Sequence, residues 1–257
     1  MMTRRWLLIL LAMWTTPAFA QLDERVWTME VRGTLGSNRI GGAFTIQDYR
    51  TFVEGHYFYA KYLTDIPLTG SMQGEELKLN EPGGGSFHLH LIGDKSAAGQ
   101  TLTFHNSIGF EGTWTGNGST FPVKIHFDYR TSGSDSTESY GAINASVYEA
   151  RVRQCISSVL KGDKNAAATL VSYPLRVNSS TSFFVRSKAE LLARWNHVFT
   201  PSVMKALSDA IPHEMFMRND QAMIGDGEVW FDEIGNIKAI NQTDALQKHL
   251  LRAAAGR

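Results

Sequence analysis

The densest cluster of residues that could do chemistry is the segment 225–241, GDGEVWFDEIGNIKAIN, which holds four acids, three glycines and a tryptophan. An EF-hand calcium loop needs oxygen ligands at its first, third and fifth positions and a bidentate glutamate at its twelfth. Counting from Asp226, the fifth position is Trp230 and the twelfth is Ile237. The spacing therefore argues against a calcium loop.

Strand geometry offers another interpretation of the same segment. Alternation places Glu228, Trp230 and Asp232 on one strand face, and residues 232–236 then form a turn that leads into a return strand. Two carboxylates beside a tryptophan could line a pocket as a general base and a stacking platform. They are more typical of the solvent-exposed face of a sheet, because unpaired charges are rarely buried. We predict a hairpin.

Histidines form the second candidate cluster. His88 and His90 lie two residues apart and so share one face of a predicted strand, with His105 and His126 on neighbouring predicted strands. Such a set could bind zinc or copper. Because Leu89 takes the inward position between the first two, we expect these histidines to be solvated side chains on the polar face instead.

The remaining candidate residues give weaker indications of a catalytic or binding role. His213 with Glu214, or His197, could act in acid–base catalysis, but structural or exposed roles are the preferred interpretation. Cys155, the only cysteine, falls at a buried helical spacing that is typical of a small hydrophobic residue. Residues 81–88, EPGGGSFH, lack the Gly-Lys-Ser/Thr ending of a phosphate loop and indicate a hairpin turn. We expect no metal and no cofactor.

The first residues, MMTRRWLLILLAMWTTPAFA, are typical of a secretory signal peptide, with predicted cleavage after Ala20. The apolar run is too short to span a bilayer, so no membrane span is expected after cleavage. Subtracting Arg4 and Arg5 from 25 basic residues leaves 23 against 25 acidic ones. This balance disfavours nucleic acid and anionic lipid as partners. We expect a periplasmic or secreted protein of the bacterial envelope.

Residues 21–129 hold eight or nine short segments of partly alternating apolar and polar residues, separated by Gly, Pro, Asn or Asp. This pattern predicts an all-β N-terminal domain, either an antiparallel barrel or a sandwich. A recurring pattern appears as Gly55-x-Tyr57-x-Tyr59, Ile66-x-Leu68-x-Gly70, Leu77-x-Leu79-x-Glu81 and Gly112-x-Trp114. In this pattern the domain resembles a small β-module of exported bacterial proteins of unknown role.

Residues 130–146, RTSGSDSTESYGAINAS, are polar and lack apolar periodicity, which indicates a linker. After it, in residues 147–257, helical patterns come first and short strand patterns follow. Ser187 and Glu190 form a capping box, and Pro201 stands at the first position of a further predicted helix. We therefore predict an α+β domain in the C-terminal half.

Several short motifs occur in residues 147–242: Gly162-Asp163, Tyr173-Pro174-Leu175, Asn219, Gln221 and Gly225-x-Gly227-x-Val229-Trp230-Phe231. With these motifs and this order of elements, the segment resembles the cone-shaped α+β fold of the nuclear transport factor 2-like superfamily. The resemblance implies a curved sheet around a pocket that serves catalysis in some members and ligand or partner binding in others. The residues that we expect to line such a pocket are Tyr173, Trp195, Phe216, Met223 and Trp230.

Three functions are compatible with these patterns. The preferred hypothesis is an exported envelope protein that binds a small apolar ligand or an envelope protein without catalysis. The alternative is a small-substrate hydrolase or isomerase that uses a pocket carboxylate or histidine, such as Asp226, Glu228 or His213. A third hypothesis is an inhibitor of a cell-wall enzyme, with the β-module as the interaction surface.

Overall fold

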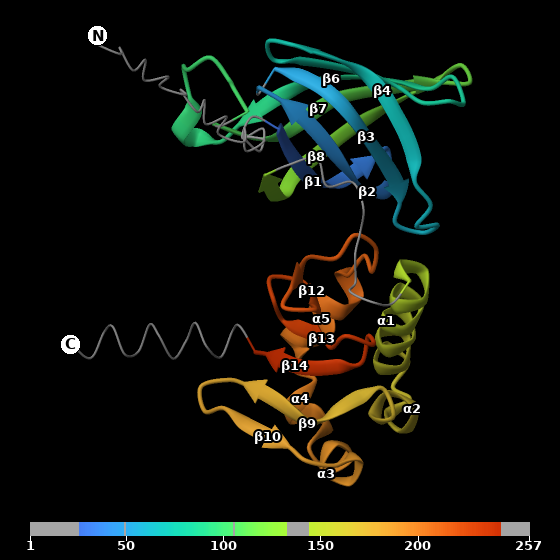
Figure 1. Cartoon of the computed structure of the whole chain (residues 1–257), viewed down its shortest axis with the longest axis vertical. Helices are drawn as coiled ribbons and strands as arrows, with labels where there is room; N and C mark the ends of the chain where they lie inside the picture. Colours follow the sequence, from blue (N-terminus) through green and yellow to red (C-terminus); the bar gives the residue numbers. More distant parts are fainter. Residues whose placement is uncertain (1–25, 49, 105, 133–143, 243–257) are drawn as a thin grey trace, which may run out of the picture.

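The structure is a computed structural model that describes residues 26–48, 50–104, 106–132 and 144–242. Two units follow one another along the chain, a closed β-barrel and a mixed sheet with helices (Figure 1). The predicted signal peptide, most of the predicted linker and the chain after residue 242 lie outside the described residues. None of the helices described is both long and apolar enough to cross a membrane.

The first unit is a barrel of eight antiparallel strands. They are β1 (Val26–Leu35), β2 (Asn38–Gln47), β3 (Thr51–Tyr59), β4 (Ile66–Gln73), β5 (Glu76–Asn80), β6 (Ser86–Gly93), β7 (Ser107–Gly116) and β8 (Ser119–Ser132). Each strand pairs with the next, and β8 pairs with β1 to close the barrel. A 3-10 helix, η1 (Lys95–Ala97), precedes β7. Of the two predicted architectures, the barrel is confirmed.

Apolar side chains fill the interior of the barrel, as the alternation of the strands requires. Along β6 the apolar residues of SFHLHLIG point inward, while His88 and His90 between them are exposed. His126 is exposed as well, and His105 lies outside the described residues. The prediction of a solvated position is therefore confirmed for His88, His90 and His126.

The second unit contains five helices and a six-stranded sheet within the described residues. Its helices are α1 (Ala145–Leu160), α2 (Lys164–Ala168), α3 (Lys188–Ala193), α4 (Trp195–Val198) and α5 (Pro201–Asp209). Its strands are β9 (Val171–Asn178), β10 (Phe183–Val185), β11 (Met217–Arg218), β12 (Gln221–Ile224), β13 (Val229–Phe231) and β14 (Ile237–Asn241). The strand order is β10-β9-β14-β13-β12-β11, with β14 and β9 parallel and the other pairs antiparallel.

Local sequence signals explain where these helices begin. The Asn144 side chain accepts a hydrogen bond from the Ser146 amide at 3.0 Å and caps α1. Ser187 Oγ accepts a hydrogen bond from the Glu190 amide at 3.2 Å and caps α3, as the predicted capping box requires. Pro201 is the first residue of α5.

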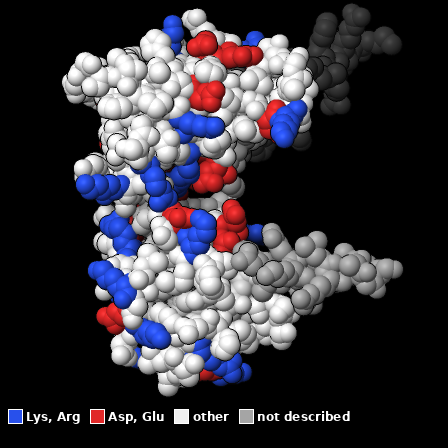
Figure 2. Space-filling view, turned by 180° about the vertical axis from the view of Figure 1, so that it is seen from behind, with Lys and Arg blue, Asp and Glu red and all other residues white. Residues whose placement is uncertain are grey.

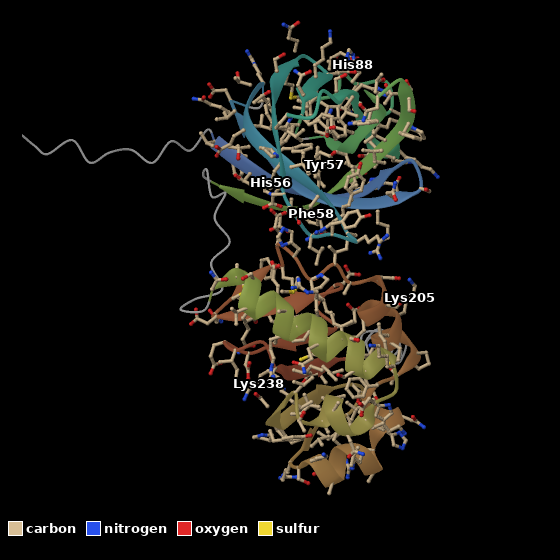
Figure 3. All side chains as sticks on the ribbon, turned by 90° about the vertical axis from the view of Figure 1, so that its right-hand side faces the viewer. His56, Tyr57, Phe58, His88, Lys205 and Lys238 are labelled. Carbon is tan, nitrogen blue, oxygen red and sulfur yellow. The ribbon has the colours of Figure 1, made fainter. Side chains whose placement is uncertain are left out.

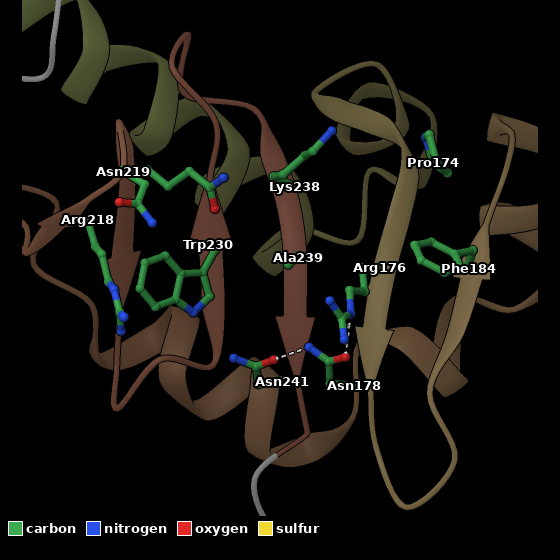
Figure 4. Close-up of a pocket in the computed structure, with 11 residues that line it drawn as sticks. Pro174, Arg176, Asn178, Phe184, Arg218, Asn219, Trp230, Lys238, Ala239 and Asn241 are labelled. Carbon is green, nitrogen blue, oxygen red and sulfur yellow. Dashed lines mark hydrogen bonds between the residues drawn. The ribbon is translucent and has the colours of Figure 1, made fainter.

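One face of the sheet packs against the helices. Val177, Phe231 and Ile240 project from this face and are fully buried together with Tyr148 and Val152 of α1. Apolar side chains of the helices and of this sheet face therefore form the core of the second unit. Among the described residues no helix covers the other face of the sheet, and Figure 4 shows the helices behind the sheet.

The predicted hairpin in residues 225–241 is confirmed, because β13 and β14 pair antiparallel with Trp230 opposite Ala239. The expectation that Glu228 and Asp232 face solvent is wrong, since these residues are only 8% and 6% exposed. Both carboxylates accept hydrogen bonds from amides of the adjoining turns. The buried acids are therefore part of the turn structure.

Candidate functional site

The helix-free face of the sheet holds a pocket of about 490 Å³ (Figure 4). This volume falls in the usual range of small-molecule sites, roughly 300–1,000 Å³. The pocket crosses the sheet from β10 to the β11–β12 turn, and its wall is basic, rich in amides and partly aromatic. Its lining residues are Pro174, Arg176, Asn178, Phe184, Arg218, Asn219, Gln221, Trp230, Lys238, Ala239 and Asn241.

The strand register brings the centre of this pocket together. Met223 lies opposite Trp230 in the pairing of β12 with β13. Ala239 of β14 lies opposite Trp230 on one side and opposite Arg176 of β9 on the other, and Phe184 of β10 continues the row. Residues in one such row project from the same face of a sheet. The small Ala239 therefore leaves a hollow between the Trp230 indole and the Arg176 side chain.

A chain of hydrogen bonds fixes the polar side chains of the floor. Arg176 Nε donates to Asn178 Oδ1 at 2.8 Å, and Asn178 Nδ2 donates to Asn241 Oδ1 at 2.6 Å. The carbonyl of Gly227 then accepts from Asn241 Nδ2 at 2.6 Å and from Trp230 Nε1 at 3.1 Å. The indole plane and the amides are thus held in place before any ligand arrives.

The charge of the pocket is positive. Arg176, Arg218 and Lys238 contribute cationic groups, and none of the lining residues is an acid or a histidine. Within the part of the chain that the structure describes, these three cations form no ion pair with a carboxylate. Guanidinium and ammonium groups in such a setting bind carboxylates and phosphates.

The residues predicted to line a pocket are divided between the two faces of the sheet. Trp230 lines the observed pocket, Phe216 contacts its ring at a centroid distance of 6.5 Å, and Met223 is its partner in register. Trp195 lies among the buried core residues on the helix side, only 7% exposed, and Tyr173 packs against the same core. Of the five predicted residues, Trp230 alone is among the lining residues of this pocket, with Phe216 and Met223 beside it.

The second polar site lies where the two units meet. Outward-facing residues of β1, β2 and β3 form two rows across the barrel wall, Glu30–Ala43–His56 and Arg32–Gly41–Phe58. The middle strand supplies the smallest side chains, so the wall is indented between its neighbours. Figure 3 shows His56 and Phe58 on the side of the barrel that faces the second unit.

The loop between α5 and β11, residues 210–216, packs against this wall. Arg32 Nη2 donates to the carbonyls of His213 and Glu214, at 3.1 and 3.0 Å, and so holds the loop on the barrel. The His213 and Glu214 side chains are buried, only 10% and 8% exposed. Acidic and basic side chains of both units gather at this waist (Figure 2).

Acids and imidazoles alternate through the junction. His213 Nδ1 lies 2.8 and 2.9 Å from the two Glu149 carboxylate oxygens, and its Nε2 lies 3.0 Å from Asp65 Oδ1. His56 Nε2 lies 3.7 Å from the same Asp65 oxygen and in contact with Glu214 Oε1. The order is therefore Glu149, His213, Asp65, His56, Glu214, with members from both units. We call these five residues the junction cluster.

Proton affinities in the junction cluster reflect these pairings. Burial lowers the pKa of His56, but its hydrogen bond to Glu214 and the charges of Glu214 and Asp65 outweigh that effect, so the pKa is raised. The hydrogen bond from His213 is the main cause that lowers the pKa of Asp65, against the opposing effect of burial. Both directions favour charged partners across the junction.

The sequence identified only part of these two sites. His213 and Glu214 were proposed as a pair, whereas the structure pairs His213 with Glu149 and Asp65, and Glu214 with His56. The pocket cations were not identified, although alternation along PLRVN places Pro174, Arg176 and Asn178 on one strand face. No comparable signal connects His213 and Glu214 with Glu149, Asp65 and His56, because these residues are far apart in sequence.

The other candidate residues have structural roles. Cys155 is fully buried, and burial raises the pKa of its thiol to about 12, which fits the predicted hydrophobic role. Asp226 and Glu228 interact within one turn, outside the residues that line the pocket. His197 is exposed.

We compared the chain with protein families, curated proteins and solved structures, and none of the three comparisons found a match.

Proposed function

We propose that this chain is a non-catalytic binding module whose sheet pocket takes an acidic sugar chain, in keeping with the exported location that residues 1–20 predict. The observation that carries the proposal is the wall composition: three cations without a carboxylate partner among the described residues surround one tryptophan and several amides. Such a wall fits an anionic ligand better than the small apolar ligand expected from the sequence.

Each component of the wall matches one part of a sugar acid. The Trp230 indole offers an apolar face on which the C–H face of a pyranose ring can pack. Asn178 and Asn241 offer amide groups for hydroxyls, and the fork of Arg176 matches a carboxylate. Because the pocket crosses several strands and is open, it suits a segment of a chain better than an enclosed small molecule.

The lining favours binding over catalysis. General acid–base catalysis needs a group that titrates near the working pH within hydrogen-bond reach of the substrate. The pocket wall contributes arginine, lysine, amide, aromatic and small residues, and none of these is an ordinary general base at neutral pH. The hydrolase or isomerase alternative would need a substrate placed elsewhere.

The test is calorimetric titration of the full chain with a tetramer of galacturonic acid, and with maltotetraose as an uncharged chain of equal length. We expect saturable binding of the acidic tetramer only, weakened by added salt because the attraction is electrostatic. Equal binding of both sugars, or binding of neither, would overturn the proposal.

Variants then locate the binding. Trp230→Ala and Arg176→Gln should each reduce affinity about tenfold or more, since a charge-assisted hydrogen bond contributes about 1.5–3 kcal/mol. Lys188→Gln removes one exposed cation from α3, outside the pocket wall, and should leave the affinity unchanged. A loss of binding in Lys188→Gln equal to that in Arg176→Gln would indicate attraction by overall charge instead of a site.

A further inference from the structure

We infer that His56, Asp65 and Glu214 form a binding site for a divalent transition-metal ion, with Zn²⁺ as the preferred ion, between the two units. One ligand atom from each residue, His56 Nε2, Asp65 Oδ1 and a Glu214 carboxylate oxygen, lies within 4.8 Å of the others. Four-coordinate zinc with bonds near 2.1 Å places its ligand atoms about 3.4 Å apart. His56 Nε2 and Asp65 Oδ1 lie 3.7 Å apart, which is close to that value.

The carboxylates of the junction cluster are not all paired with lysine or arginine, which favours a bound divalent cation. Arg32 faces Asp128 at 3.5 Å, and Arg153 faces Glu149 at 3.7 Å. Asp65 and Glu214 have no lysine or arginine partner in the described residues, and their ion-pair partners are imidazoles. A metal ion binds deprotonated imidazole, so it would displace the proton from His56 Nε2, and one divalent cation would then neutralise the two negative charges of Asp65 and Glu214.

An unpaired buried atom points to the same ligand. The Glu214 side chain is only 8% exposed, and its Oε2 has no hydrogen-bond partner among the described residues while Oε1 contacts His56. Leaving a carboxylate oxygen buried without a partner is costly, because the oxygen has lost its water and gained no donor. A metal ion bound at this carboxylate would supply the missing partner.

The surroundings also suit a metal site. His213, held by Glu149, lies 3.0 Å from Asp65 Oδ1 and so orients a ligand from the second coordination shell. Asp65 is 49% exposed, which gives an ion access from solvent and leaves room for water as a further ligand. The mixture of one imidazole and two carboxylates favours zinc or manganese over calcium, which takes oxygen ligands alone.

The experiment is calorimetric titration of Zn²⁺ into chelator-treated full chain without a histidine tag. We expect one ion per chain, with binding at least 100-fold weaker in His56→Ala and Glu214→Gln. His213→Gln should weaken binding about 10- to 100-fold, as loss of a second-shell partner does. His88→Ala is the matched control, because His88 is an exposed barrel histidine, and it should bind as the unaltered chain does.

Two further measurements keep the inference testable if a buried variant misfolds. Asp65→Asn changes a half-exposed ligand and should also weaken Zn²⁺ binding at least tenfold. Ca²⁺ should bind at least 100-fold more weakly than Zn²⁺. The inference is overturned if the unaltered chain binds no stoichiometric Zn²⁺, if Asp65→Asn binds normally, or if Ca²⁺ binds equally well.

Discussion

The ring of Phe58 meets the imidazole of His213 edge to face, with centroids 4.4 Å apart and planes at 82°. Phe58 projects from the outer wall of the barrel, yet it is completely buried, because the second unit covers it. The two ring nitrogens of His213 meanwhile contact Glu149 and Asp65. Apolar packing and polar pairing thus meet in one residue of the junction cluster.

Replacing Phe58 with alanine should therefore weaken the junction. Removing a buried phenylalanine ring costs about 3–5 kcal/mol of unfolding free energy when the site cannot collapse. Urea denaturation followed by tryptophan fluorescence measures the loss. Phe121→Ala removes a ring that is 43% exposed on the barrel and should cost less than about 1 kcal/mol. Equal losses in the two variants would show that the second unit does not cover Phe58 in solution.

The raised pKa of Glu30 should make the stability of the fold depend on pH. Burial raises its pKa from 4.5 to about 7, Arg32 opposes this shift, and the charges of Glu214 and Asp128 add to it. An acid with a raised folded-state pKa stabilises the fold below its unfolded pKa, and this contribution is lost as pH rises through the folded pKa. At pH 8 the ionisation of Glu30 lowers the free energy of unfolding by at most about 3 kcal/mol.

The variant Glu30→Gln isolates this effect. Compared with the unaltered chain, it should show little difference at pH 4.5 and a growing advantage in unfolding free energy from pH 5 to pH 8. Urea denaturation in the presence of a chelator measures the difference at each pH. Glu76→Gln changes an exposed acid of β5 and should give no such trend. A pH-independent difference for Glu30→Gln would contradict the raised pKa.

Asp232 should be important for the stability of the second unit. Its Oδ1 accepts hydrogen bonds from the Ile234 and Asn236 amides at 3.1 and 2.9 Å, and Ser172 Oγ donates to Oδ2. Asp232→Ala leaves these donors without a partner, and each buried unpaired donor costs about 1–3 kcal/mol. We expect a total loss of about 2–4 kcal/mol in urea denaturation. Glu233→Ala, in the same turn but exposed, should cost much less, and a reversed order would refute the role.

The parts of the fold that could be predicted are those set by local alternation and capping. The inward leucines of β6, the cap at Ser187 and the hairpin of β13 and β14 follow from residues close in sequence. Alternation does not say which face of a strand another element will cover. For this reason Trp195 and Trp230 were expected in one pocket, although one lies in the core and the other on the open face.

The junction cluster and the buried acids were beyond such reasoning for a different reason. Glu149, His213 and Asp65 are brought together by the packing of two units that are separate in sequence. Asp232 was expected in solvent because a charged side chain alone gives no sign of the amides that will surround it. Both results depend on tertiary partners, which the local pattern does not contain.

The loop that fills the indentation of the barrel wall continues directly into the pocket. Glu214 lies in the junction cluster, and Arg218, four positions further along the chain, lies in the pocket wall. This stretch of backbone therefore connects the two sites directly. If an ion bound at the junction cluster changed the affinity of the pocket for an acidic sugar, thermodynamic reciprocity would require the sugar to change the affinity for that ion by the same factor.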